Sequence, residues 1–204
     1  MKKTMLFFII IITAIYLFST VREVSPQGLM YQTIQAAINA SVNGDTILVH
    51  PGIYRECIDF NAKSIILQSE YKVTADTNAV INTIIDGSHL DAAVKIINCE
   101  QAEINGFTII NGIGRLEPIF AEEGFRYGGG LYCDNSNLII ANNVIKDNKS
   151  FFGGGVYTND SNIHFIANTI TRNLSLSFGG GITLALPDNS TKIINFDSIN
   201  KNSI

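Results

Sequence analysis

Two copies of one pattern lie end to end in the second half of the chain, and this repeat constrains the fold more than any other feature. A Gly-Gly-Gly-Leu-Tyr stretch at 128–132 returns as Gly-Gly-Gly-Val-Tyr at 153–157, which gives a period of 25 residues. A third and less regular copy begins at Gly179. Self-similarity at this period is typical of solenoids, in which each repeat packs against its neighbours.

The residues within each repeat favour β-strands. Short runs rich in β-branched and aliphatic side chains, such as 138–140 and 163–166, are separated by Gly, Asn, Asp and Ser. No run carries apolar residues at helical spacing over a dozen positions, and the Leu-x-x-Leu-x-Leu frame of leucine-rich repeats does not occur. We therefore predict a coil of three short strands that turns at Gly and Asn.

Side chains alternate in and out along a strand, so the repeat predicts which residues stack from coil to coil. Tyr132 and Tyr157 should stack on the outside. Asn148, Asn173 and Asn202 recur at a turn and should form a ladder of side-chain amides, because successive coils lie about 4.8 Å apart. The two predicted inward stacks are Leu131, Val156 and Ile182, and Ile145, Ile170 and Ile199.

The N-terminus has the order of an export signal. Two lysines precede an apolar stretch from Met5 to Phe18, and Ser19 and Thr20 supply small residues for cleavage. We expect residues 1–27 to be signal and leader, and the protein to be secreted or held at the cell surface. The apolar stretch is short for a membrane span, so no span is expected after signal removal; an uncleaved anchor is the alternative.

Residues 28–45 are expected to form an N-terminal cap. Thr33 is a suitable N-cap for a short helix. Three apolar residues fall on one face of that helix: Ile34, Ala37 and Ile38. An amphipathic helix before the first strand would cover the open apolar end of a solenoid, which is then expected over 46–204.

The composition limits the kinds of ligand and partner that the protein is expected to bind. The chain has 14 basic and 18 acidic residues, a formal net charge of −4, and no basic cluster, so no nucleic-acid partner is expected. Cys57, Cys99 and Cys133 are far apart and show no CxxC spacing. We expect these cysteines to be buried core residues rather than a disulfide or metal site.

Six segments between the expected helix and the repeats carry a family likeness. They include Thr-Ile-Gln-Ala-Ala-Ile, Asn-Gly-Asp-Thr-Ile and Pro-Gly-Ile-Tyr-Arg-Glu. The segments are 33–38, 43–47, 51–56, 64–67, 83–87 and 104–109. In these segments the chain resembles right-handed parallel β-helix proteins of the pectin-lyase-like superfamily. The resemblance implies an all-β, right-handed parallel β-helix solenoid with a short N-terminal capping helix.

Two groups of this superfamily share different parts of the pattern. The opening is similar to pectin methylesterases, but their Gln-Asp-Thr-Leu, Asp-Phe-Ile-Phe-Gly and Gly-Arg-Pro-Trp motifs do not occur, and the chain has no Trp. The repeats resemble those of polymorphic outer-membrane proteins, which carry a Gly-Gly-Ala-Ile-like element and a Phe-x-x-Asn element. Residues 154–156 and 165–168 approximate these two elements. Gly replaces Ala in the first element, and the first copy of the repeat has Ile140 where the second element would have Phe.

The sequence shows no catalytic constellation. Enzymes on this fold cleave polysaccharides with clustered carboxylates, or with a base and Ca²⁺ in lyases. The Asn-Thr-Asp, Asp-Asp, Gly-His-Gly and Arg-Ile-Lys elements of polygalacturonases do not occur. Asp134, Asp147 and Asp160 lie at repeat corners, where Asx turns favour them. We therefore expect no catalytic residue, no metal site and no cofactor here.

One stretch, 112–127, interrupts the repeat. It carries charges of both signs among aliphatic and aromatic residues, and long loops on a rigid scaffold are common binding sites. The candidate binding residues are Arg115, Glu122, Glu123 and Arg126. The alternative is a loop that folds over the side of the solenoid with solvated charges.

The sequence ends at residues 202–204 in mid-coil without a capping segment, so we expect an incomplete C-terminal end and a longer surface protein. We expect an exported cell-surface or secreted protein with a structural or binding role, adhesin-like or glycan-binding, and a polysaccharide or other cell-surface ligand. The alternative is a polysaccharide lyase or glycoside hydrolase that acts on an acidic polysaccharide, with Ca²⁺ in the lyase case.

Overall fold

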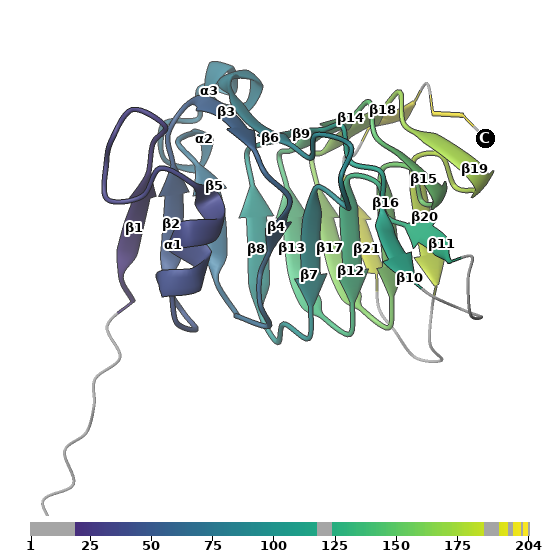
Figure 1. Cartoon of the computed structure of the whole chain (residues 1–204), viewed down its shortest axis with the longest axis horizontal. Helices are drawn as coiled ribbons and strands as arrows, with labels where there is room; N and C mark the ends of the chain where they lie inside the picture. Colours follow the sequence, from purple (N-terminus) through teal and green to yellow (C-terminus); the bar gives the residue numbers. More distant parts are fainter. Residues whose placement is uncertain (1–18, 118–123, 186–191, 196–197, 201, 204) are drawn as a thin grey trace, which may run out of the picture.

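The computed structural model describes residues 19–117, 124–185, 192–195, 198–200 and 202–203. The chain winds into an all-β solenoid whose strands lie side by side along the molecule (Figure 1). The strand pairs of its three main walls are parallel, and β10–β11 is the one antiparallel pair among the described strands. The predicted fold class, a right-handed parallel β-helix, is confirmed.

Four sheets, named A to D here, make up the solenoid. Sheet A contains β1 (Val21–Val24), β2 (Thr46–Val49), β5 (Ile66–Ser69), β8 (Ala102–Asn105), β13 (Asn137–Ala141), β17 (Asn162–Ile166) and β21 (Lys192–Asn195). Sheet B contains β3 (Gly52–Arg55), β6 (Thr83–Asp86), β9 (Thr108–Ile110), β14 (Val144–Lys146), β18 (Thr169–Thr171) and β22 (Ser198–Asn200). Sheet C contains β4 (Ile58–Asp59), β7 (Val94–Ile97), β12 (Leu131–Asp134), β16 (Val156–Asn159) and β20 (Ile182–Ala185). Sheet D contains β10 (Arg115–Glu117), β11 (Phe125–Tyr127), β15 (Lys149–Phe152) and β19 (Leu174–Phe178).

The predicted inward stacks occur in the predicted register. Leu131 pairs with Val156, which pairs with Ile182, and the first two are completely buried. In the second stack, Ile145 and Ile170 are completely buried. Ile199 keeps the register but is 46% exposed, since no described coil packs over it.

The predicted asparagine ladder is present at the turns that follow sheet B. The Asn148 side-chain amide donates to Asn173 Oδ1 at 3.1 Å, and Asn173 donates to Asn202 Oδ1 at 3.1 Å. The same oxygens accept from the backbone N–H groups of Asn148 and Asn173. Each amide thereby satisfies polar groups that a turn inside the solenoid wall would otherwise leave unpaired. A second ladder, which was not predicted from the sequence, joins Asn143 to Asn168.

The capping helix α1 (Ile34–Ala40) forms as predicted. The Thr33 hydroxyl accepts a hydrogen bond from the Ala36 N–H at 3.2 Å. The three residues of its apolar face, Ile34, Ala37 and Ile38, are completely buried in the core. The Gln35 side chain pairs with the backbone of Asp59 in both directions, at 2.7 and 3.1 Å. Helix α1 therefore closes the core and also covers the free edge of β4.

Two features of the N-terminal half were not predicted. Strand β1 falls within the stretch expected to be leader, and it pairs with β2 along the edge of sheet A. The buried Asp45 carboxylate holds it there, because it accepts from the Thr20 N–H at 2.9 Å and pairs with Arg22 at 3.0 Å. Two short helices follow β5: α2 (Tyr71–Thr74) packs beside β5, and α3 (Thr77–Asn82) projects above sheet B (Figure 1).

All three cysteines are free thiols. Cys99 and Cys133 are buried, as predicted, whereas Cys57 is only partly buried and donates to the Gly87 carbonyl oxygen. Within the described ranges, no helix has the length and apolar character needed to cross a membrane.

Candidate ligand-binding surfaces

The interrupting stretch forms a hairpin rather than the predicted loop. Strands β10 and β11 pair antiparallel, and β11 then continues into sheet D through the pairing of Tyr127 with Phe152. Arg115 lies opposite Tyr127, whereas Arg126 lies opposite Leu116 one position along. Because side chains alternate across a strand, the two arginines point to opposite faces of the hairpin. The structure thus separates two of the predicted binding residues; Glu122 and Glu123 lie outside the described residues.

Arg115 belongs to a compact group of charged and aromatic side chains. Its Nε lies 3.1 Å from Glu117 Oε1, and its guanidinium lies over the Tyr132 ring, 4.9 Å from the ring centroid. The Tyr132 hydroxyl donates to the same carboxylate at 3.0 Å. Burial, together with the charges of Asp134 and Glu117, raises the pKa of Tyr132 well above its ordinary value. The phenol is therefore a neutral hydrogen-bond donor at physiological pH.

Arg126 has a different role. Its Nη1 donates to the Gly114 carbonyl oxygen at 2.7 Å, on the face of the hairpin where Leu116 is half exposed. This contact fixes the base of the hairpin, because Gly114 precedes β10 and has a φ of 88°. Arg126 therefore supports the hairpin, and Arg115 faces the solenoid.

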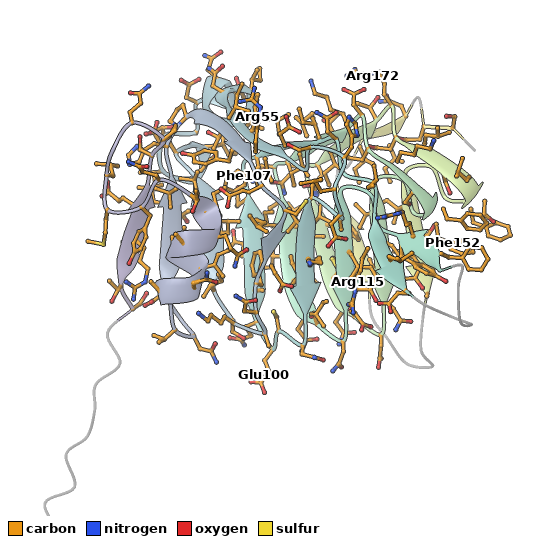
Figure 2. All side chains as sticks on the ribbon, viewed as in Figure 1. Arg55, Glu100, Phe107, Arg115, Phe152 and Arg172 are labelled. Atoms are coloured by element: carbon orange, nitrogen blue, oxygen red, sulfur yellow. The ribbon has the colours of Figure 1, made fainter. Side chains whose placement is uncertain are left out.

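Aromatic rings continue from Tyr132 onto sheet D. The Tyr132 and Tyr157 rings stack with centroids 5.8 Å apart and an interplanar angle of 13°, which confirms the predicted outer stack. Arg115 and Glu117 cover Tyr132, so its exposed fraction is only 5%. We call the following residues the aromatic surface: Phe125, Tyr127, Phe151, Phe152, Tyr157 and Phe178. In Figure 2 Phe152 lies at one end of the molecule among other rings, with Arg115 nearby.

The rings of the aromatic surface contact one another from coil to coil. Phe152 stacks on Tyr127 at 5.0 Å and on Phe178 at 5.9 Å, and Phe125 packs 4.3 Å from Phe151. Phe125 and Phe178 keep 38% and 65% of their surface exposed. The surface therefore offers apolar ring area to solvent on a rigid sheet.

The glycine triplets form the tight turn at which the chain passes from sheet D to sheet C. A Cβ at Gly130 would lie 2.6 Å from the Gly155 carbonyl oxygen of the next coil, so only glycine fits there. Gly153, which follows Phe152, has a φ of 64°, in the left-handed region. The chain thus turns directly after each ring, and rings from both sheets share one face.

A second charged group lies on the outer face of sheet C beside the tyrosines. Lys95, the register partner of Tyr132, lies 3.0 Å from Asp91 and 3.6 Å from Asp59. Burial disfavours the charged amine, but the hydrogen bond and charge of Asp91 and the charge of Asp59 outweigh burial and raise the pKa of Lys95. These charges are paired with one another.

The acidic residues predicted to lie at turns differ in position. Asp147 and Asp160 occupy corners with φ values of 57° and 42°, as expected for turn residues, and Asp147 pairs with Arg172. Asp134 is instead the last residue of β12 and accepts from the Asn159 amide at 2.8 Å. In the described part of the chain, no three His, Cys, Asp or Glu side chains are grouped closely enough to hold a metal ion.

Sequence reasoning missed most of the aromatic surface, although a signal was present. Tyr127, Phe152 and Phe178 each stand directly before a glycine triplet. They recur at almost the same period as the glycines, so a ring before each turn belongs to the repeat itself. The predicted stack included only the tyrosines after the triplets.

Comparisons with known proteins include two similar solved structures. No protein-family model matches the chain, and no curated protein sequence matches it. A crystal structure of a mutant pectin methylesterase in complex with a hexasaccharide is similar at 13% identity and a TM-score of 0.49. The match covers 76% of this chain but 55% of the other, so the chain spans about half that protein's length. A pectin methylesterase from Aspergillus niger is similar at 14% identity and a TM-score of 0.43, with coverage of 89% and 85%.

Proposed function

We propose that this protein is exported and binds glycans outside the cell through the aromatic surface. The observation that carries this proposal is the row of stacked, partly exposed rings beside the Arg115–Glu117 pair. Sugar rings have apolar C–H faces that pack on aromatic rings, and charged or amide groups nearby can hydrogen-bond to their hydroxyls. Exposed apolar patches with a polar rim are typical of interaction surfaces.

The distribution of charge favours a binding protein over an enzyme. An enzyme of this fold needs acids and bases that converge on one bound substrate. Here Glu117 is engaged by Arg115 and Tyr132, and Lys95 is engaged by two aspartates. The chain devotes its repeated positions to stacked asparagine, tyrosine and aliphatic residues, which is what a rigid scaffold requires.

The second candidate function is a lyase or hydrolase that acts on an acidic polysaccharide. The observation that favours it is the group of Asp59, Asp91 and Lys95, which lies on the same face of sheet C as Tyr132. In such an enzyme one of the two aspartates would act as the base, and Lys95 would hold its carboxylate in place. Unsaturated products or new reducing ends from polygalacturonate, measured with and without Ca²⁺, would establish this activity and overturn the binding-only proposal.

Binding is tested by affinity electrophoresis of the purified protein in gels that contain single polysaccharides. The double variant Phe125→Ala with Phe178→Ala should lose retardation, because it removes the two most exposed rings of the surface. Val73→Ala is the matched control, since Val73 is 70% exposed on α2, away from the aromatic surface. Equal retardation of the double variant and the control would contradict the proposal.

A further inference from the structure

A groove of about 1190 Å³ crosses the outer face of sheet A. Its floor contains Glu103, Ile139 and His164, which are register partners on β8, β13 and β17. The residues that follow them, Ile104, Ile140 and Phe165, are completely buried in the core. Because side chains alternate, the floor residues face away from the core and away from sheet C. The groove and the aromatic surface therefore lie on different sides of the solenoid.

The groove presents one floor residue per coil. Adjacent strands lie about 4.8 Å apart, so a chain that lies across the strands would meet a new side chain at each such step. Asn137 and Asn162 repeat along the rim in the same way, and the Asn162 amide donates to Asn137 Oδ1 at 2.8 Å. The groove is thus matched to an extended ligand.

The backbone of the groove floor is already paired. Strand β13 pairs with β8 on one side and β17 on the other, and β17 pairs in turn with β21. A peptide that binds by strand addition needs an open sheet edge. The centre of the groove offers no such edge, so side chains must recognise the ligand.

The charged side chains of the groove disfavour the binding of anions. Among the described residues, its lining contains Glu100, Glu103 and His164 and no lysine or arginine. The nearby Lys72 Nζ lies 2.7 Å from Glu103 Oε2, so its charge is already paired within the protein. The amide of Asn105 also donates to Glu103, at 2.8 Å, so this carboxylate is held in place as an acceptor. Phosphate, sulfate and uronate groups would meet acidic side chains without a free cation in the described lining.

We propose that this groove binds a neutral, unbranched glycan chain that lies across the strands of sheet A. Glu103 and the rim amides accept and donate hydrogen bonds to hydroxyl groups, and Ile139 packs against a sugar face. A neutral sugar suits this lining because it offers many hydroxyls and no negative charge. The site is separate from the aromatic surface, so the proposal goes beyond the function proposed above and does not depend on it.

The test measures binding of cellohexaose, xylohexaose and mannohexaose by calorimetry, with polygalacturonate as the acidic comparison. Ile139→Arg should weaken binding of the neutral hexaose about tenfold or more, because it fills the centre of the groove and adds a cation. Ile53→Arg is the matched control: Ile53 is also a partly exposed strand residue, but on sheet B. Both variants should keep the thermal melting profile of the wild type.

Results that would overturn the proposal include no binding of any neutral hexaose at millimolar concentration, equal affinity of Ile139→Arg and Ile53→Arg, and a preference of the groove for polygalacturonate. The Phe125→Ala and Phe178→Ala double variant should keep neutral-hexaose binding at the groove. A loss in that variant alone would assign the binding to the aromatic surface, so failure of the two proposals is distinguishable. Displacement of the hexaose by an unstructured casein peptide would indicate a polypeptide ligand and also overturn the proposal.

Discussion

The guanidinium of Arg115 lies 4.9 Å from the centroid of the Tyr132 ring and covers it, while both side chains contact the Glu117 carboxylate. Arg115 belongs to sheet D and Tyr132 to sheet C, so this three-residue contact joins the hairpin to sheet C. The hairpin is thereby held against the wall of the solenoid.

Arg115→Ala should lower the free energy of unfolding by about 1 kcal/mol, because it removes a cation–π contact and a partly exposed ion pair. The same change uncovers the Tyr132 ring and should alter near-ultraviolet circular dichroism. Arg126→Ala is the control for the spectrum alone, since Arg126 faces the other side of the hairpin but also donates to the Gly114 carbonyl oxygen. Urea titration checks both variants; an identical near-ultraviolet spectrum for Arg115→Ala would contradict the assigned contact.

Asn173→Ala should be among the most damaging single changes in the repeats. It removes the acceptor for the Asn148 amide and backbone N–H, and the donor to the Ile145 carbonyl oxygen. Buried groups left without partners should cost about 2 to 4 kcal/mol. Asn162→Ala, at an exposed rung, should change the free energy of unfolding by less than about 0.5 kcal/mol. Chemical denaturation compares the two, and similar midpoints would argue against the ladder.

Stability should fall as the pH rises through the folded-state pKa of His50. Burial disfavours the charged ring, but Glu23 and Glu70, at 3.1 and 2.6 Å, outweigh it and raise the pKa above the ordinary value of 6.5. The stabilisation is complete below about pH 6.5 and is lost at higher pH. Because the partners are partly exposed, it should amount to less than about 1 kcal/mol.

The pH prediction is checked by urea midpoints measured at pH 6.0 and 8.5. The difference between the two pH values should shrink in His50→Gln, because the neutral amide cannot titrate. His164→Gln, on the exposed face of sheet A, is the control substitution of the same type. An unchanged difference in His50→Gln would show that other groups dominate.

Strand β1 should be required for a stable first coil. Removal of residues 1–24 would uncover the edge of β2 and delete Val24, which is completely buried. We expect that shortened protein to melt at lower temperature and to aggregate, because an open sheet edge pairs with other chains. Removal of residues 1–18 alone keeps β1 and should leave melting unchanged. Calorimetry and light scattering compare the two forms, and equal behaviour would contradict a structural role for β1.

Much of the fold follows from the repeat, because periodic residues in a solenoid must occupy equivalent places. The register of Leu131 with Val156 and the ladder of Asn148 with Asn173 were predictable for this reason. Strand β1 was not, since a four-residue strand that directly follows a long apolar stretch of sequence has no pattern of its own. Its place depends on the Asp45 carboxylate, which comes later in the chain.

The candidate site was predicted less well than the fold. Arg115 and Arg126 were grouped because they share one charged stretch, but a hairpin sends them to opposite faces. The contact of Arg115 with Tyr132 joins positions 17 residues apart that belong to different sheets, and no local pattern contains it. The groove on sheet A could not be predicted from the sequence either, because side chains from several coils form it.

The asparagine ladder also bears on how the protein would respond to force. The hydrogen bonds between its side-chain amides connect successive coils. They therefore run along the axis of the solenoid, as the backbone hydrogen bonds between strands do. Tension applied along that axis would load several rows of such bonds in one coil together. The chain should therefore yield coil by coil, as a series of discrete rupture steps, and serve as a stiff spacer until the first step.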